Sequence, residues 1–452
     1  MTPGGKLLQR LGLDRPELRA WAMYDWALSS VQTTLMVAVF PVYFVQVVAS
    51  DLPASAASQR LATANTIVAI VVACLGPVLG TLSDFVAAKK RFLGVCVVLG
   101  AMATAGLFTV GQGDVMRGLS LFVAALICAT ASTVFYESLL PRIARPHEVD
   151  RVSTAGYAFG YIGGGVLLAA NLAWILKPEL IGLSPASDPR SPAGTLPVRL
   201  ALLSVAFWWV IFSVPLFRRV PEPAPLLPPN ERAGRALRLT LAQFGSTVRE
   251  LRRFRQALLM LVAFLLYNDG IQTIIKMATA YGAEIGIGSS DLIAAILIVQ
   301  FVGIPCAFLF GAVAQRFGAK RSLFVGLSIY VAISILGYFM RTATHFYLLA
   351  FLTGLVQGGT QALSRSLFAS LIPAYKSGEF FGFYAVFEKF ANIFGPLFFA
   401  ITIAVTGESR LAILSVILFF VAGALVLSLV DVDEGRRAAR EAEEDLARQQ
   451  AA

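Results

Sequence analysis

The fold is decided by a short polar stretch between two apolar runs, GTLSDFVAAKKRFL at residues 80–93. Residues 61–83 and 92–112, which lie on either side, contain no charged residue. Each run is long enough to cross about 30 Å of hydrocarbon as a helix that rises about 1.5 Å per residue. Lys89, Lys90 and Arg91 lie between them. An apolar run, a basic turn and a second apolar run predict a helical hairpin that spans a membrane.

The same pattern recurs along the whole chain. Of its 452 residues, 57% are hydrophobic and 14% are charged, against about 25% charged residues in a typical soluble domain. This composition excludes a disordered chain and argues against a soluble globular protein, and the lack of alternating strands argues against an outer-membrane barrel. We predict an all-α membrane protein with twelve transmembrane helices at about residues 20–49, 61–83, 92–112, 118–141, 152–176, 199–217, 257–283, 291–315, 322–340, 345–371, 380–405 and 411–430.

Lysine and arginine indicate how these helices are oriented. With both termini placed in the cytoplasm, 27 of the 37 Lys and Arg residues lie in inner segments and 7 in outer segments. This is the asymmetry that the positive-inside rule describes. The anionic inner leaflet of the lipid bilayer then accounts for the net charge of +10, and no nucleic-acid partner is needed.

The middle of the chain carries a boundary. Residues 218–256 begin with a Pro-rich polar stretch and continue with Leu237, Leu241, Phe244, Val248 and Leu251 at spacings of four and three, which is typical of an amphipathic helix on a membrane surface. We interpret this segment either as a tether that sets how the two halves move or as a passive linker. The predicted domains are 1–217, a six-helix bundle; 218–256, the cytoplasmic linker; 257–431, a second six-helix bundle; and 432–452, a charged cytoplasmic tail.

Glycine, polar, basic and proline positions of the first half recur in the second half at a nearly constant distance along the chain. The counterparts of Gly80, Asp84, Lys89 and Lys90 lie 231 positions later, and those of Pro141 and Gly164 lie 232 and 231 positions later. Matched landmarks predict two related six-helix bundles with a binding site between them. The second-half counterparts are Gly311, Gln315, Lys320, Arg321, Pro373 and Gly395.

Several kinds of chemistry have little support. The four cysteines each lie inside an apolar run without metal-ligand spacing, and the two histidines lie near predicted helix ends. No phosphate-binding loop with Walker A spacing occurs. We therefore expect no metal, no cofactor and no enzymatic activity.

Seven charged residues lie inside the predicted spans. Each would cost about 2.5–3.5 kcal/mol at the bilayer centre if it had no partner. Such charges are tolerated where they face a water-filled cavity or pair with each other. The first, fourth, seventh, tenth and eleventh predicted helices carry them: Asp25, Glu137, Asp269, Lys276, Arg365, Glu388 and Lys389.

We expect these charges and their neighbours to bind a polar solute between the bundles. Because a carboxyl group removed from water takes up a proton more readily, a coupled proton has four candidate carriers, Asp25, Glu137, Asp269 and Glu388. The competing interpretation is a set of fixed interhelical ion pairs, such as Glu137 with Arg365. The predicted binding residues are Tyr24, Asp25, Trp26, Tyr136, Glu137, Tyr267, Asn268, Asp269, Gln272, Gln361, Arg365 and Glu388.

The 80–93 stretch resembles the signature loop of the major facilitator superfamily, in which an Asp follows a glycine by four residues and paired basic residues come next. Phe85 departs from that pattern, where an Arg is usual. The resemblance implies that Asp84 contacts the inner end of the eleventh helix and holds the outward-facing state. The predicted conformational latch is Gly80, Asp84, Lys89, Lys90, Gln315 and Arg316.

Four further motifs carry a narrower resemblance: WAMYDWALSSVQTTLMVAVFPVYF, GYAFGYIGGG, FLLYNDGIQTIIKMA and FFGFYAVFEKFANIFGP. They resemble the autophagy protein 22-like (UMF1) branch of that superfamily, which includes fungal vacuolar amino-acid exporters. The resemblance implies a secondary transporter for an amino acid or similar zwitterion. We expect it to work by alternating access, coupled to protons as a symporter, with a facilitative transporter as the alternative. The alternatives are a sugar, muropeptide-fragment or drug-like solute on the same fold, or a non-transporting sensor or polytopic membrane enzyme. We expect a monomer in a bacterial inner membrane.

Overall fold

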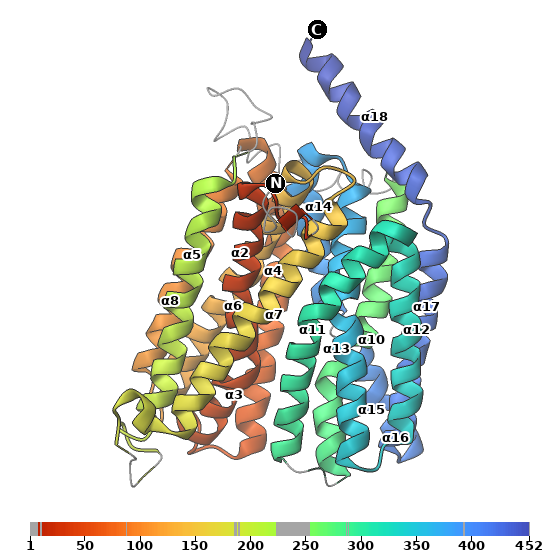
Figure 1. Ribbon diagram of the computed structural model, residues 1–452. Coiled ribbons are helices and arrows are strands. Elements are labelled where there is room, and N and C mark those ends of the chain that lie inside the picture. The colour runs from red at the N-terminus through yellow and green to blue at the C-terminus, as the bar shows by residue number, and fades with distance from the viewer. Residues whose placement is uncertain are drawn as a thin grey trace.

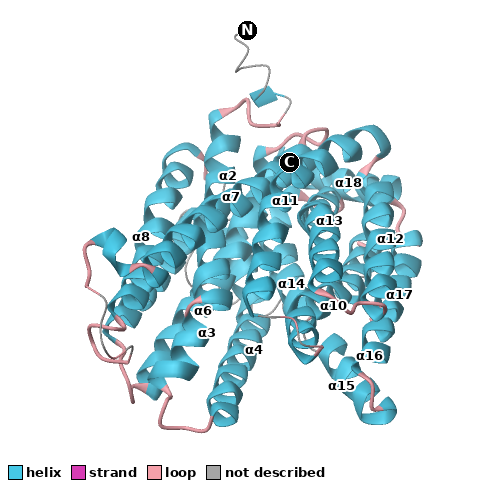
Figure 2. Ribbon diagram, turned by 60° about the horizontal axis from the view of Figure 1, so that its bottom comes forward, coloured by secondary structure: helices cyan, strands magenta, loops and turns pink. Residues whose placement is uncertain are grey.

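The computed structural model describes residues 8–9, 11–86, 88–184, 188, 190–222, 254–285, 287, 289–391 and 394–451. In this part of the chain the regular structure is entirely helical and contains no strand (Figure 2). The predicted amphipathic helix around Leu237–Leu251 lies outside the described residues.

The first half of the chain forms one group of helices, which Figure 1 shows on the left. Its first helix is interrupted: α-helical turns alternate with two π-helical stretches, each of which replaces the usual i→i−4 hydrogen bonds by i→i−5 bonds. The elements are α2 (Pro16–Ser30), η1 (Val31–Ala38), α3 (Phe40–Tyr43), η2 (Phe44–Val48), α4 (Ala54–Val86), α5 (Lys89–Gly106), α6 (Val115–Ile143), α7 (Val149–Leu176) and α8 (Leu196–Arg219).

The second half forms a group on the right of Figure 1. In it, the segment predicted as the eleventh helix is divided into two, and the chain ends in a helix that projects from the bundle. The elements are α10 (Arg255–Glu284), α11 (Ser289–Phe317), α12 (Ala319–Tyr338), α13 (Ala343–Ser370), η6 (Ala374–Lys376), α14 (Ser377–Phe390), α15 (Phe394–Thr406), α16 (Ser409–Ser415), α17 (Ile417–Ser428) and α18 (Val432–Ala451).

Ten helices in the described residues are long and apolar enough to cross a membrane. Two of the twelve predicted spans are missing from this count. One is α13, which carries Gln357, Gln361 and Arg365, and the other is divided between α14 and α15. The protein is thus a multi-pass membrane protein, whereas the count of twelve spans, the domain boundaries and the cytoplasmic termini stay predictions.

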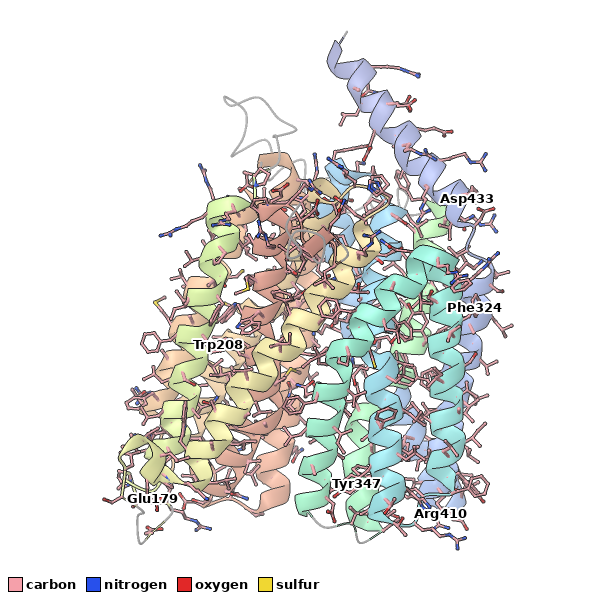
Figure 3. The ribbon with its side chains drawn as sticks, viewed as in Figure 1. Glu179, Trp208, Phe324, Tyr347, Arg410 and Asp433 are labelled. Carbon is pink, nitrogen blue, oxygen red and sulfur yellow. The ribbon has the colours of Figure 1, made fainter. Side chains whose placement is uncertain are left out.

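The start of α2 and the whole of α18 lie at one end of the bundle, which we call the Asp84 end (Figure 1). Glu179, Tyr347 and Arg410 lie at the opposite end (Figure 3). Trp208 and Phe324 lie toward opposite sides of the bundle in the same view. The helical axes therefore run between the two ends, as expected for helices that cross a membrane together.

The two halves pack against each other through α4 with α14, α7 with α11 and α13, and α6 with α14. Glycine allows the closest of these contacts. A Cβ on Gly80 would overlap the carbonyl group of Gly378, and a Cβ on Gly303 would lie 3.1 Å from the ring of Tyr161. Small residues at such positions let helix backbones approach within direct contact.

The tail helix α18 packs on the ends of neighbouring helices. The backbone N–H of Asp431 donates to the side-chain oxygen of Gln256 at 2.8 Å, and the amide nitrogen of Gln256 donates to Glu434 at 2.5 Å. Further along, Glu443 accepts the backbone N–H of Ala374 at 2.7 Å. Ala439 and Ala442 are buried, so α18 packs on the bundle as far as Glu443, and its end projects from the bundle (Figure 1).

Candidate functional site

The candidate site is built around Arg365 of α13, whose side chain reaches from the second half into the first. Arg365 is 1% exposed. Its Nε donates to the hydroxyl of Ser153 at 2.9 Å, and its Nη2 donates to the backbone carbonyl of Ser153 at 2.8 Å. Both Nη atoms lie 3.2 Å from Oδ2 of Asp25 on α2, and Nη1 lies 3.9 Å from Oε1 of Glu137 on α6. The guanidinium therefore connects both halves of the protein.

Aromatic rings enclose this guanidinium. Its carbon lies 4.8 Å from the ring centroid of Trp21, 4.5 Å from that of Tyr157 and 5.8 Å from that of Tyr136. The hydroxyl of Tyr136 also donates to Asp25 at 2.8 Å. Rings at these distances attract a cation electrostatically and keep water away from it. Arg365 is thus held by charge, hydrogen bonds and ring faces together.

The cluster has more acidic than basic side chains. Two carboxylates, Asp25 and Glu137, face one guanidinium. Asp25 is engaged by Arg365 and Tyr136, whereas Glu137 accepts no hydrogen bond from the described residues and makes only the 3.9 Å ion pair. Both acids keep some side-chain exposure, 16% for Asp25 and 10% for Glu137. The arrangement can therefore take up one more positive charge at Glu137.

A second polar group lies between α10 and α13. The amide nitrogen of Gln361 donates to the side-chain oxygen of Asn268 at 2.6 Å, and the hydroxyls of Tyr267 and Ser364 are hydrogen-bonded at 2.5 Å. The side-chain nitrogen of Asn268 is buried without a partner among the described residues. Since Ser364 precedes Arg365 in the chain, this group lies next to the Arg365 cluster.

Other predicted binding residues make no hydrogen bond, ion pair or ring contact with Arg365 in the described residues, although the ring centroid of Tyr24 lies 4.8 Å from that of Tyr136. The hydroxyl of Tyr24 accepts a hydrogen bond from Trp209 of α8 at 3.4 Å, and Trp26 stacks on Trp208 of the same helix with ring centroids 6.0 Å apart. Asp269 lies on α10 beside Gly395 of α15. Gln272 is half-buried on the same helix. The structure thus brings together only part of the predicted set.

Three other charges of the predicted set, on α10 and α14, are less enclosed. Glu388 and Lys389 form an ion pair at 3.7 Å, with side chains 32% and 22% exposed. Lys276 is exposed. These three groups differ from Arg365 and Asp269, which are buried.

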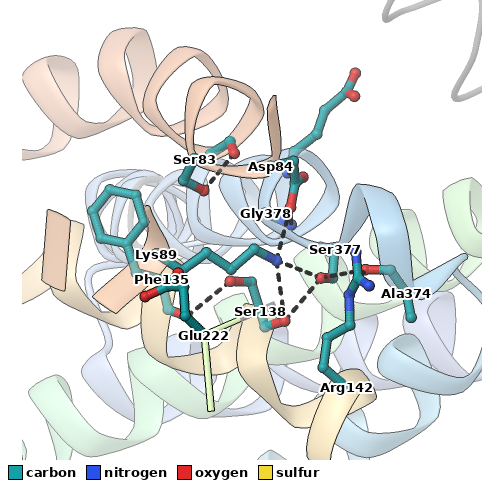
Figure 4. Close-up of polar contacts among 12 residues, drawn as sticks. Ser83, Asp84, Lys89, Phe135, Ser138, Arg142, Glu222, Ala374, Ser377 and Gly378 are labelled. Atoms are coloured by element: carbon teal, nitrogen blue, oxygen red, sulfur yellow. Dashed lines mark hydrogen bonds and ion pairs between the residues drawn. The ribbon is translucent and has the colours of Figure 1, made fainter. Parts of the chain in front are cut away.

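The predicted latch connects α4 and α5 to the start of α14, and Figure 4 shows its contacts. The backbone N–H groups of Gly378 and Glu379 donate to the carboxylate of Asp84 at 3.2 and 2.9 Å. Lys89 is 1% exposed, and its Nζ lies 2.7 Å from both Asp84 Oδ1 and Ser377 Oγ. An acid at a helix N-terminus is stabilised by the backbone N–H groups and the helix dipole. Asp84 and Lys89 therefore hold the two halves together at this end.

Of the other predicted latch residues, Gly80 packs against the backbone of Gly378, whereas Lys90, Gln315 and Arg316 do not join this contact. Lys90 donates from Nζ to the carbonyl of Val220 at 2.6 Å, within the first half. Gln315 and Arg316 are exposed at the end of α11, and Arg316 lies over the ring of Phe317. Nearby, Arg142 of α6 donates from Nε to the carbonyl of Ala374 at 2.7 Å (Figure 4), which is a further bond between the halves.

Three residues of the Arg365 cluster are absent from the sequence prediction: Trp21, Ser153 and Tyr157. Trp21 could have been found, since it precedes Asp25 by one helical turn and shares its face. Ser153 and Tyr157 belong to α7, which has no charge in its interior. Gly156 of the same helix is an indirect sign that another element packs closely there, because a Cβ on it would lie 3.0 Å from Nη2 of Arg365.

In the described residues, no group of three or more His, Cys, Asp or Glu side chains could hold a metal ion. The polar atoms of the site are instead carboxylates, a guanidinium, amides and hydroxyls. Such groups recognise charged and hydrogen-bonding solutes.

Comparison with solved structures identifies the fold. The proton:xylose symporter XylE bound to 6-bromo-6-deoxy-D-glucose superposes with a TM-score of 0.68 at 14% identity, covering 92% of this chain and 95% of that chain. The human organic anion transporter MFSD10 superposes with a TM-score of 0.66 at 14% identity, covering 94% and 100%. At this identity the likeness concerns the fold alone, which is that of the major facilitator superfamily.

Comparison of sequences identifies the family. Residues 13–440 match the family described as "Vacuole effluxer Atg22 like". The uncharacterized MFS-type transporter YxiO of Bacillus subtilis (strain 168) is 34% identical over 91% of this chain and 94% of its own length. Autophagy-related protein 22-1 of Aspergillus niger is 27% identical over 64% of this chain, and the match spans about half, 48%, of the fungal protein. The chain therefore belongs to the Atg22-like branch of the major facilitator superfamily of transporters.

Proposed function

We propose that this protein is a secondary active transporter that moves an amino acid or a similar zwitterion by alternating access, coupled to protons. The observation that carries the proposal is the buried bridge from Arg365 to Asp25 and Glu137, because it places opposite charges from both halves at one point. The proposed location is a bacterial cytoplasmic membrane, and the proposed working unit is a monomer.

The charges of the cluster suit a zwitterion. An ammonium group can bind at Glu137, whose carboxylate accepts no hydrogen bond from the described residues, and a carboxylate can bind Arg365, whose guanidinium forms bidentate pairs with such groups. A solute carboxylate that binds the guanidinium of Arg365 competes with Asp25 for the same N–H donors. Solute binding would thus weaken a bond that connects the halves, which couples binding to the conformational change.

The contacts at the Asp84 end support alternating access. Asp84 and Lys89 reach the start of α14, and Arg142 reaches Ala374, so the halves are joined there in this conformation. If the termini are cytoplasmic, as the distribution of Lys and Arg predicts, this conformation is closed toward the cytoplasm. The proton as coupling ion has indirect support from the fold shared with a proton:xylose symporter.

Counterflow in proteoliposomes tests the proposal. Purified protein is reconstituted with unlabelled solute inside, and uptake is followed for labelled amino acids, sugars and dipeptides. We expect exchange of one or more amino acids, loss of that exchange in Arg365→Ala and Glu137→Gln, and normal exchange in Glu408→Gln, which removes an exposed acid remote from the cluster.

Three outcomes would contradict the proposal. They are exchange of sugars only, exchange of amino acids that persists in Arg365→Ala, and failure of the folded wild-type protein to exchange any of the three classes. The first would favour a sugar transporter on the same fold, and the third a sensor or a membrane enzyme.

A further inference from the structure

Asp269 is a buried acidic side chain with surroundings unlike those of the Arg365 cluster. It lies in the middle of α10 and is 1% exposed. Neither of its carboxylate oxygens accepts a hydrogen bond of ordinary geometry from the described residues, and it forms no ion pair with them. Asp25, by contrast, has both a guanidinium and a tyrosine hydroxyl beside it.

The helices packed against α10 bring no cation to Asp269. α15 and α17 contain no charged residue, and Arg365 of α13 is engaged by Asp25 and Ser153. Lys276, two turns along α10, attracts Asp269 electrostatically, but it is exposed and lies beyond ion-pair distance. The other charges on these elements lie toward their ends: Glu379, Glu388 and Lys389 on α14, Asp291 and Arg316 on α11, Lys320 and Arg321 on α12, and the charged residues of α18.

Gly395 of α15 packs closely against Asp269. A Cβ on Gly395 would be 3.0 Å from Oδ1 of Asp269 and 2.9 Å from its backbone oxygen. The hydroxyl hydrogen of Thr273 is donated to the Asp269 carbonyl at 2.7 Å, so it does not serve the carboxylate. A sodium ion needs several oxygen ligands and an ammonium group needs several acceptors, whereas a proton needs a single carboxylate oxygen.

An ionised carboxylate without a partner is strongly disfavoured in a dry interior, whereas the neutral acid is tolerated far better. We infer that Asp269 carries the proton that moves with the solute. It holds the proton in the conformation seen here and releases it when the opposite conformation admits water. The inference rests on the proposed transport function.

The step is a simple proton transfer. A hydronium ion donates a proton to one oxygen of the Asp269 carboxylate, which forms the O–H bond of the acid and leaves a water molecule. The reverse transfer, to water on the other side of the membrane, restores the carboxylate. Asp25 and Glu137 lie beside Arg365 and take no part in this transfer, so the groups that bind solute and the group that binds the proton are separate.

Infrared difference spectroscopy of the purified protein tests whether Asp269 is protonated. Samples of wild type, Asp269→Asn, Asp269→Glu and Glu408→Gln are titrated from acid to alkaline pH, and the carbonyl band of protonated carboxylic acids is followed. We expect a band that persists near neutral pH in wild type, that is lost in Asp269→Asn, that is shifted but present in Asp269→Glu, and that is unchanged in Glu408→Gln.

Transport then tests coupling. In proteoliposomes, Asp269→Asn should retain counterflow of the labelled amino acid and lose the extra uptake that a pH gradient drives in wild type. Absence of the infrared band near neutral pH in wild type overturns the inference, whatever is transported. Persistence of the band in Asp269→Asn overturns it too. Full gradient-driven uptake by Asp269→Asn overturns it as well. Absence of counterflow in wild type, with the Asp269 band present, overturns the proposed transport function instead.

Discussion

Arg365 shows why a single buried charge can serve two purposes. Its guanidinium is neutralised by Asp25 and supported by Ser153 and three rings, so it is stable in this conformation. Arg365 belongs to the second half of the protein, whereas Asp25 and Ser153 belong to two different helices of the first half. When the halves separate, those bonds must break, and a charged solute can then replace them. A lysine could not do this, since it lacks the planar set of five donors.

Lys89 and Lys90 are neighbours in the chain but differ in their surroundings. Lys89 is buried with Asp84 and Ser377, whereas Lys90 donates to a carbonyl of its own half. Lys89→Met leaves Asp84 without its cation and should destabilise the closed Asp84 end by about 3–5 kcal/mol. Lys90→Met removes one hydrogen bond from a charged donor and should cost about 1.5–3 kcal/mol without opening that end.

Labelling of a single cysteine at Ala369, which is buried at the Asp84 end of α13, measures this opening. The labelling rate by a water-soluble maleimide should rise in Lys89→Met and stay at the wild-type level in Lys90→Met. Equal rates in both variants would show that Lys89 does not hold the halves together.

At the scale of the helix, α7 offers a matched pair of glycines. A Cβ on Gly156 would lie 3.0 Å from Arg365 and Trp21 and would also meet the Asp25 carboxylate, whereas a Cβ on Gly165 meets nothing within 4 Å. Alanine within a helix is intrinsically favoured over glycine by about 0.5–1 kcal/mol. We expect Gly165→Ala to keep or slightly raise the thermal unfolding temperature.

Gly156→Ala should behave in the opposite way. Its methyl group displaces Arg365 or Asp25, and overpacking of this kind costs about 1–3 kcal/mol. Thermal unfolding in detergent should show a lower midpoint, and amino-acid counterflow should fall. A Gly156→Ala variant with wild-type stability and exchange would mean that α7 can shift without disturbing the Arg365 cluster.

At the scale of the whole molecule, alternating access requires the seam between α7 and α11 to open. A Cβ on Gly311 would lie 3.1 Å from the Cβ of Thr154 across this seam. The two Cβ atoms of a disulfide lie about 3.8 Å apart. In a background without the native cysteines, the pair Thr154→Cys and Gly311→Cys should therefore form a disulfide under oxidation.

The disulfide should stop counterflow, and a reducing agent should restore it, while Thr154→Cys alone keeps its exchange under both conditions. Gel mobility after cleavage of the chain between the two positions measures the extent of cross-linking. Full exchange by cross-linked protein would show that the halves do not separate here, and alternating access by this movement would be wrong.

Much of the fold could be predicted from the sequence, because apolar length and polar turns act locally. The resemblance to the Atg22-like branch is confirmed by the match over residues 13–440. The charged side chains could be assigned to their helices for the same reason: Asp25 to α2, Glu137 to α6 and Arg365 to α13. The division of the segment containing Glu388 into α14 and α15 was not predicted, since its apolar pattern continues across both.

The site could be predicted less well, because its contacts join residues hundreds of positions apart. Hydrophobic periodicity says that Arg365 is buried, but not that Asp25 and Ser153 neutralise and support it. Nor does it separate Asp269, which has no partner in the described residues, from Glu388, which pairs with Lys389. Gln315 and Arg316 were expected from the repeat to mirror Asp84 and its neighbours, yet both are exposed, whereas Asp84 bonds to the start of α14 in the opposite half.

Both backbone polar groups of Ala374 are bound by side chains. Its N–H donates to Glu443 of α18, and its carbonyl oxygen accepts from Arg142 of the opposite half. A load on the last helix is therefore transmitted through the backbone of a single residue to the seam that has to open in each cycle. A fusion partner or an antibody fragment placed on α18 would act as a brake on turnover, and it would do so from a surface remote from the solute.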